Sequence, residues 1–150
     1  MYSFLGKIEA KADNKGRLFV PAPYRKQLLQ EGDSRWVIRK NDEFEHLDIY
    51  PESVWNEEVQ LIASKLNLLD DEDNLFYMQY TSSADLLEMD ANGRILIPKR
   101  YLDSVGIVSE SLFVGTTKKI ALWEKSNYEK RMKPASEFLK LKKEKLKSLN

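Results

Sequence analysis

The sequence predicts a mixed α/β protein of the α+β kind, in which two copies of one small unit pair about a pseudo-twofold axis. The first observation is a motif, Asp13-Asn14-Lys15-Gly16-Arg17, that returns as Asp90-Ala91-Asn92-Gly93-Arg94; an apolar strand and a proline follow each copy. The second is a tyrosine seven residues after each arginine, at Tyr24 and Tyr101. The third is that both halves are expected to run strand, turn, strand, short helix, strand, turn, strand, helix. Such a repeat indicates a duplicated architecture.

The first half contains four expected strands and two expected helices, which follow from polarity alternation, turn residues and helical spacing. In chain order we expect a strand over 7–12, a turn over 13–17, a strand over 18–20, a helix over 24–30, a strand over 36–39, a turn over 41–43, a strand over 46–50 and a helix over 51–66. Gly32 is well placed to end the short helix, because glycine accepts positive φ at a helix C-terminus.

The second half repeats this order after an acidic break at 70–73, which we interpret as a solvated linker. Residues 74–80 fit either a strand or a helix, and we favour a helix because its start is acidic and its apolar face is long. The other expected elements are a strand over 84–89, a turn over 90–94, a strand over 94–97, a helix from 98 to 106, a strand over 112–114, a turn over 116–119, a strand over 120–123 and a helix over 126–133. Tyr50 and Trp55 have the same spacing as Trp123 and Tyr128.

These patterns divide the chain into a first unit over 1–70, a second unit over 71–133 and a Lys-rich tail over 134–150. Neither unit has enough apolar residues to form a stable hydrophobic core alone, so the two units are expected to share one core. The tail is weakly amphipathic, and we interpret it as a solvated final helix or a frayed end. A subunit contact and an auxiliary contact to nucleic acid are the alternatives.

The composition argues against an enzyme and against a membrane protein. The 150 residues include no cysteine, which excludes disulfides, thiolate metal sites and a Cys nucleophile, and the one histidine, His46, has no second histidine with which to share a metal. No apolar run approaches the roughly 20 residues of a membrane helix, and the N-terminus does not resemble a signal peptide. We expect a cytoplasmic, non-enzymatic protein without a cofactor, a metal ion, a membrane partner or a small-molecule substrate.

The formal net charge is zero, but the charges are unevenly distributed. Residues 7–40 contain nine Lys or Arg against four Asp or Glu, whereas residues 41–75 contain eleven acidic residues against one lysine. We interpret the acidic block as ordinary solvated surface. The basic block coincides with the first motif, and the local field rather than the total charge attracts a polyanion.

Each motif is predicted to hold an arginine at the rim of a tight turn. The aspartate can accept hydrogen bonds from backbone amides of the turn, and the glycine can adopt positive φ. The arginine then begins a strand, where its guanidinium can bind guanine or phosphate, and a β-ribbon fits the major groove of DNA. The predicted turn-forming residues are Asp13, Gly16, Asp90 and Gly93, and the predicted DNA-binding residues are Arg17, Arg94, Lys15, Asn92, Lys7 and Lys11.

These motifs resemble the MraZ family of bacterial transcriptional regulators, which have two tandem units of the SpoVT-AbrB, swapped-hairpin type. The resemblance covers about residues 1–133 and rests on Asp13-x-x-Gly16-Arg17-Leu18-x-Val20-Pro21, Asp90-x-x-Gly93-Arg94-Ile95-Leu96-Ile97-Pro98, and the strand ends Tyr50-Pro51 and Leu122-Trp123. It implies a pseudo-dimer around a small barrel with flanking helices, whose Asp-x-x-Gly-Arg turns face DNA. The second turn departs from the first, because Asn92 replaces the lysine, and this leaves its direct role open.

The resemblance also implies a function. Subunits would assemble into a closed homo-oligomeric ring, bind repeats of double-stranded DNA in the promoter of the division and cell-wall gene cluster, and regulate it, usually as a repressor. Such a protein would be cytoplasmic and associated with the nucleoid. The alternative from another class is an oligomeric scaffold, or an antitoxin-like module whose turns bind a protein partner.

Overall fold

The structure, a computed structural model, describes residues 1–149. Its elements in chain order are β1 (Lys7–Lys11), β2 (Arg17–Phe19), α1 (Ala22–Gln30), β3 (Arg35–Lys40), β4 (His46–Pro51), α2 (Glu52–Ser64), α3 (Asp71–Ser82), β5 (Ala84–Glu88), β6 (Arg94–Leu96), α4 (Lys99–Ser104), β7 (Glu110–Gly115), β8 (Ile120–Glu124), α5 (Lys125–Arg131), α6 (Ala135–Lys145) and a 3₁₀ turn over Lys147–Leu149. Residues 74–80 are helical, as predicted, and Asp70 caps that helix by accepting from the Asp73 amide.

Six strands form one sheet in the order β1-β7-β8-β4-β3-β5, in which all neighbours are antiparallel. Each half contributes its first strand to the other half, because β1 pairs with β7 and β5 pairs with β3. The two short strands β2 and β6 pair separately as a ribbon. The arrangement confirms the predicted α+β fold with two tandem β-α-β units.

The strands do not close into the small barrel that the resemblance implied. Within residues 1–149 the six-stranded sheet is open, with β1 and β5 at its two edges. Closure would require these edge strands to pair with each other. Instead, the chain leaves each edge strand through one of the repeated turns and forms the separate β2–β6 ribbon.

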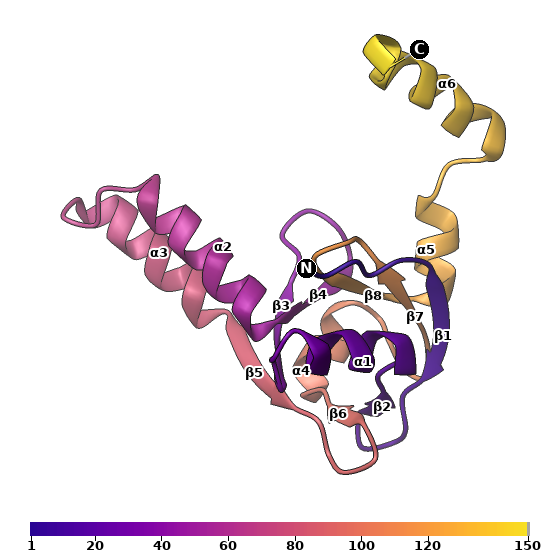
Figure 1. The fold of residues 1–150 in the computed structure, drawn as a ribbon, viewed down its shortest axis with the longest axis horizontal. Helices are drawn as coiled ribbons and strands as arrows, with labels where there is room; N and C mark the ends of the chain where they lie inside the picture. Colours follow the sequence, from indigo (N-terminus) through magenta and orange to yellow (C-terminus); the bar gives the residue numbers. More distant parts are fainter. Residues whose placement is uncertain (150) are drawn as a thin grey trace.

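The core lies between one face of the sheet, the ribbon, and helices α1 and α4 (Figure 1). At the centre of the ribbon Leu18 is paired with Ile95, and both side chains are fully buried. Tyr24 and Tyr101, the tyrosines of the repeat, occupy matching buried places on α1 and α4. The other large buried side chains of the core include Phe4, Leu28, Trp36, Ile38, Leu47, Ile49, Ile97, Phe113 and Ile120.

Helices α2 and α5 are attached to the sheet by the two aromatic pairs that share a spacing in the sequence. Tyr50 on β4 meets Trp55 on α2 edge-to-face at 5.2 Å between ring centroids, and Trp123 on β8 meets Tyr128 on α5 in the same way at 5.7 Å. Helices α2 and α3 form a hairpin that projects from one side of the body, whereas α5 and α6 lie on the other side (Figure 1). Residue 150, the last of the predicted tail, lies outside the described residues.

No helix within residues 1–149 combines the length and the apolar character needed to cross a membrane.

The two halves exchange backbone hydrogen bonds at the repeated turns. The Gly16 carbonyl accepts from the Ile97 amide at 2.9 Å, and the Gly93 carbonyl accepts from the Val20 amide at 3.0 Å. Both glycines have positive φ, of 86° and 81°. A Cβ atom on Gly16 would lie 2.6 Å from the Ile97 carbonyl oxygen. The contact between the halves therefore requires glycine at this position.

We predict that Gly16→Ala destabilises the protein more than Gly32→Ala. Gly32 has the same φ, 85°, but no atom within 4 Å of its would-be Cβ, so its substitution costs only the backbone strain of about 1–2 kcal/mol. Gly16→Ala adds the clash with the other half, about 1–3 kcal/mol more. Denaturant unfolding of the two variants measures the difference, and equal losses would show that the halves are not in tight contact here.

Candidate nucleic-acid interface

The first turn is closed by the side chain of Asp13. Its Oδ1 accepts from the amides of Lys15 and Arg17, both at 2.9 Å, and its Oδ2 accepts from the Arg17 Nε at 2.6 Å. The backbone closes the same loop, because the Asp13 carbonyl accepts from the Gly16 amide and the Asp13 amide donates to the Arg17 carbonyl. One carboxylate thus fixes both the turn and the direction of the arginine.

The second turn repeats this geometry bond for bond. Asp90 Oδ1 accepts from the amides of Asn92 and Arg94, at 2.9 and 3.0 Å, and Oδ2 accepts from the Arg94 Nε at 2.8 Å. The Asp90 amide donates to the Arg94 carbonyl, and the Gly93 amide donates to the Asp90 carbonyl. The duplicated motif therefore encodes a duplicated local structure.

Hydrogen bonding in the turns stabilises the ionised aspartates. The pKa of Asp13 is lowered to about 2, mainly because the carboxylate accepts from the Arg17 amide and then from the Arg17 side chain. The pKa of Asp90 is also lowered, with the Arg94 amide as the largest cause. Each turn therefore retains its charge-assisted contact at neutral pH.

Each guanidinium keeps its outer edge available for a ligand. The side chains of Arg17 and Arg94 are 34% and 27% exposed, and only Nε is bonded to the turn aspartate. Within residues 1–149 no protein oxygen accepts a hydrogen bond from the Nη atoms of either arginine. Two Nη nitrogens per arginine, with four N–H donors, are thus free in a fixed orientation, which suits bidentate binding to a base edge or a phosphate.

The outer face of the β2–β6 ribbon combines these arginines with exposed apolar side chains. The register places Arg17 opposite Leu96 and Phe19 opposite Arg94, and the Arg94 guanidinium lies 5.8 Å from the Phe19 ring centroid. Phe19 and Leu96 are both more than half exposed. Sequence reasoning missed these two residues, although the period of two along a strand places each of them on the same face as the arginine of its own strand.

The structure brings only some of the predicted basic residues to the turns. Lys15 is exposed in the first turn and borders a groove of about 430 Å³ beside α4, and Asn92 occupies the equivalent place in the second turn. Lys11 lies at the end of β1 next to its turn, 3.4 Å from Glu110. Lys7 lies at the far end of β1, with its Nζ 5.7 Å from the centroid of the Tyr128 ring.

Arg25 on α1 links the first half to the second turn. Its Nη1 donates to the Asn92 carbonyl at 3.3 Å, and its side chain occupies the space that a Cβ on Gly93 would need. At the equivalent place by the first turn, Leu102 on α4 lies 3.4 Å from a would-be Cβ on Gly16. The two turns thus differ in the side chain that supports them from behind.

The one histidine of the chain, His46, lies away from both turns and has an acidic neighbour, Asp48. His46 is buried in β4, where its ring packs 4.8 Å from that of Trp123 and burial lowers its pKa below the usual value. Its Nδ1 lies 3.5 Å from Asp48 Oδ1, a pair that lacks a nucleophile. Among residues 1–149, no three or more His, Asp or Glu side chains are grouped so that they could hold a metal ion.

The fold and the two turns define a duplicated α+β protein with two aspartate-anchored arginines on one ribbon. A family model described as "MraZ protein, putative antitoxin-like" matches residues 3–77 and 81–148. Relatives named transcriptional regulator MraZ occur in Bacteroides fragilis, with 45% identity over 87% of this chain and 82% of that protein, and in Bacteroides thetaiotaomicron, with 43% identity over 92% and 88%. A further one, in Phocaeicola vulgatus, is 40% identical over 81% and 79%. The chain belongs to the MraZ family.

We predict that Asp13→Asn reduces the dependence of stability on acid pH. Because the folded pKa is near 2 and the unfolded value is about 3.9, the ionised Asp13 stabilises the fold above about pH 4, and this contribution is lost as the pH falls from about 4 to about 2. The asparagine retains an acceptor oxygen but cannot titrate. Urea unfolding from pH 6 to pH 2 should show a smaller decline for the variant, and parallel curves would contradict the assigned pKa.

Proposed function

We propose that this chain is a sequence-specific DNA-binding regulator that represses transcription from the promoter of the division and cell-wall gene cluster. The observation that carries the proposal is the pair of turns that hold Arg17 and Arg94 on one short ribbon with free Nη donors. The names of the relatives support regulation of transcription. The proposed setting is the cytoplasm, with the protein bound to the nucleoid, and the role is not enzymatic.

The ribbon supplies the contacts that a β-type reader of the major groove requires. In the proposed complex Arg17 and Arg94 donate pairs of hydrogen bonds to guanine, and Lys15 neutralises a phosphate. Phe19 and Leu96 lie in the same row and offer apolar contact to thymine methyl groups. Asn92 and Lys11 make supporting contacts, and Lys7, at the far end of β1, contributes only to the general field.

A closed ring of subunits would convert these few contacts into strong binding. Two arginines and one lysine per chain provide low affinity alone, but several chains bound to promoter repeats act together because each further contact is intramolecular. In this proposal residues 1–70 and 71–133 each supply one turn, and 134–150 form a basic tail outside both units.

The second candidate function is an antitoxin-like module that binds a protein. The description of the matching family model favours it, and the exposed Phe19 and Leu96 could equally contact a protein surface. The two candidates differ in their response to salt, because only DNA binding releases a counterion for each neutralised phosphate. Capture of one protein, without any shift of promoter fragments, would favour this candidate.

We predict that Arg17→Ala abolishes binding to the DNA upstream of the protein's own gene. The substitution removes the free donors but leaves the Asp13 contacts to the turn amides, so circular dichroism and size in solution should not change. Lys118→Ala is the control, because this exposed lysine follows β7 at the end opposite the first turn. A gel shift compares the three proteins, and unchanged binding by Arg17→Ala would refute the assignment.

We predict that Lys15→Ala weakens binding by a similar factor on all DNA sequences. Loss of one phosphate contact should reduce the slope of log K against log salt by about 1 per bound subunit. Fluorescence anisotropy between 50 and 300 mM salt measures the slope for specific and scrambled duplexes. A selective loss on the specific duplex would assign Lys15 to base recognition instead.

A further inference from the structure

The molecule has an acidic end and a basic end. The hairpin of α2 and α3 projects from one side of the body, and α5 and α6 lie on the other (Figure 1). From Glu52 to Asp73 the hairpin contains seven acidic residues and one lysine, Lys65, whereas residues 125–149 contain nine Lys or Arg against three glutamates. Opposite charges on opposite sides favour contact between two copies in the same orientation.

The tip of the acidic hairpin exposes apolar and acidic side chains that its own chain leaves unpaired. Leu69 is 94% exposed and Leu68 is 41% exposed. Asp70 and Asp73 are already engaged within the hairpin, because their carboxylates accept hydrogen bonds from the backbone amides of Asp73 and Asn67, respectively. In the described part of the chain, Asp71 and Glu72 form no ion pair and accept no side-chain hydrogen bond.

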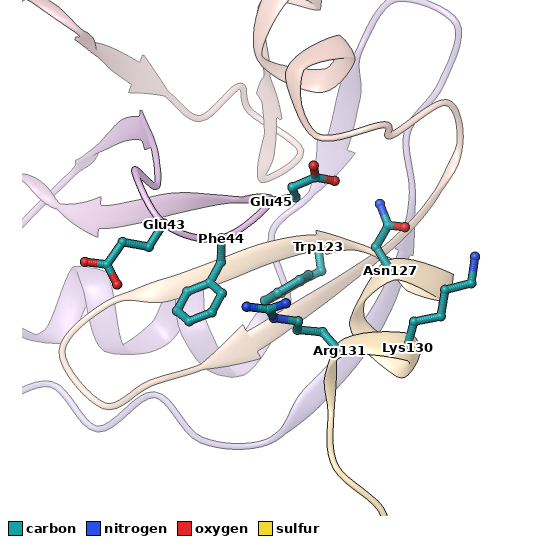
Figure 2. Close-up of a pocket in the computed structure, with 7 residues that line it drawn as sticks. All are labelled: Glu43, Phe44, Glu45, Trp123, Asn127, Lys130 and Arg131. Atoms are coloured by element: carbon teal, nitrogen blue, oxygen red, sulfur yellow. The ribbon is translucent and has the colours of Figure 1, made fainter.

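An apolar groove of about 420 Å³ lies at the opposite side, between the β3–β4 turn, β8 and α5. The residues that matter for docking are Phe44, Trp123, Tyr128, Arg131 and Met132. Figure 2 shows the adjoining hollow, which shares three of them: the Arg131 guanidinium lies beside the Phe44 ring, 5.0 Å from its centroid, and Lys130 extends from the same helix. Glu43 and Glu45 border this hollow, so its positive charge is confined to the α5 side.

We propose that the hairpin tip of a second copy docks in this groove. Leu68 and Leu69 cover Trp123 and Met132, while Asp71 and Glu72 meet Arg131 and Lys130 at the rim. The chain's own tip cannot fill its own groove, because the two lie on opposite sides of the body (Figure 1). This inference rests on the proposed self-assembly and names its contact.

The contact joins two different surfaces of the same chain, so it is heterologous. Each copy offers its tip to one neighbour and its groove to the other, and such a head-to-tail contact closes into a ring when the rotation between subunits allows it. The β2–β6 ribbon belongs to neither surface. All copies in an assembly could therefore present their arginines at the same time.

The test compares a tip variant, Leu69→Asp, with a groove variant, Arg131→Glu, by size-exclusion chromatography with light scattering. Both positions are exposed, so the fold should be retained, and Leu29→Asp, at an exposed leucine on α1, is the control. We expect an oligomer for the wild type and the control, and a monomer for each variant. An equimolar mixture of the two variants should form a 1:1 dimer and no larger species, because it restores one intact tip and one intact groove.

The outcomes separate this contact from the assembly itself. A monomeric wild-type protein would overturn both the proposed ring and the contact. An oligomeric wild type with both variants equally oligomeric would overturn the contact alone and leave the ring standing. A mixture that stays monomeric, although each variant is dissociated, would show that tip and groove do not bind each other. If the contact forms as proposed, each variant should also bind promoter repeats at least about 100-fold more weakly than the wild type, because avidity is lost.

Discussion

The structure depends on the exchange of backbone hydrogen bonds between its two halves. The carbonyl of Gly16 accepts a hydrogen bond from the Ile97 amide, and the carbonyl of Gly93 accepts one from the Val20 amide. In both cases the donor belongs to the other half of the chain. This exchange requires positive φ and, at Gly16, the absence of a Cβ. Because the arginine follows the glycine directly, the same bonds that join the halves also fix the relative positions of Arg17 and Arg94. The contact between the halves and the placement of the ribbon therefore depend on the same hydrogen bonds.

Rigidity of the turns matters for recognition. An arginine whose Nε is already bound to an aspartate loses less conformational freedom when its Nη atoms bind a ligand, so more of the interaction energy appears as affinity. In the proposed assembly the ribbon would lie apart from the hairpin tip and from the groove beside α5, so DNA binding and self-assembly would use separate surfaces. The proposed contact would also give the acidic hairpin a role that its composition alone did not indicate, because Leu68 and Leu69 are exposed at its tip.

Local features could be predicted from the sequence, and features that depend on pairing could not. The order of elements, the helix over 74–80 and the paired aromatics followed from spacing and from capping residues. The open sheet was not foreseen, because whether β1 meets β5 depends on tertiary register. Phe19 and Leu96 were missed because they are apolar like the buried Leu18 and Ile95 beside them, so polarity alone does not distinguish the two faces of these short strands. The contact of Arg25 with the second turn joins residues 67 positions apart, which no local pattern predicts.

Hydrogen–deuterium exchange with and without the upstream duplex can locate the DNA-binding surface. We expect slower exchange in peptides that contain 13–19 and 90–96, the turns and the ribbon, on addition of the specific DNA and not of a scrambled duplex. Protection confined to α5 and α6, with unchanged exchange in both turns, would contradict this expectation, because DNA would then be bound by the basic tail and not by the duplicated arginine turn.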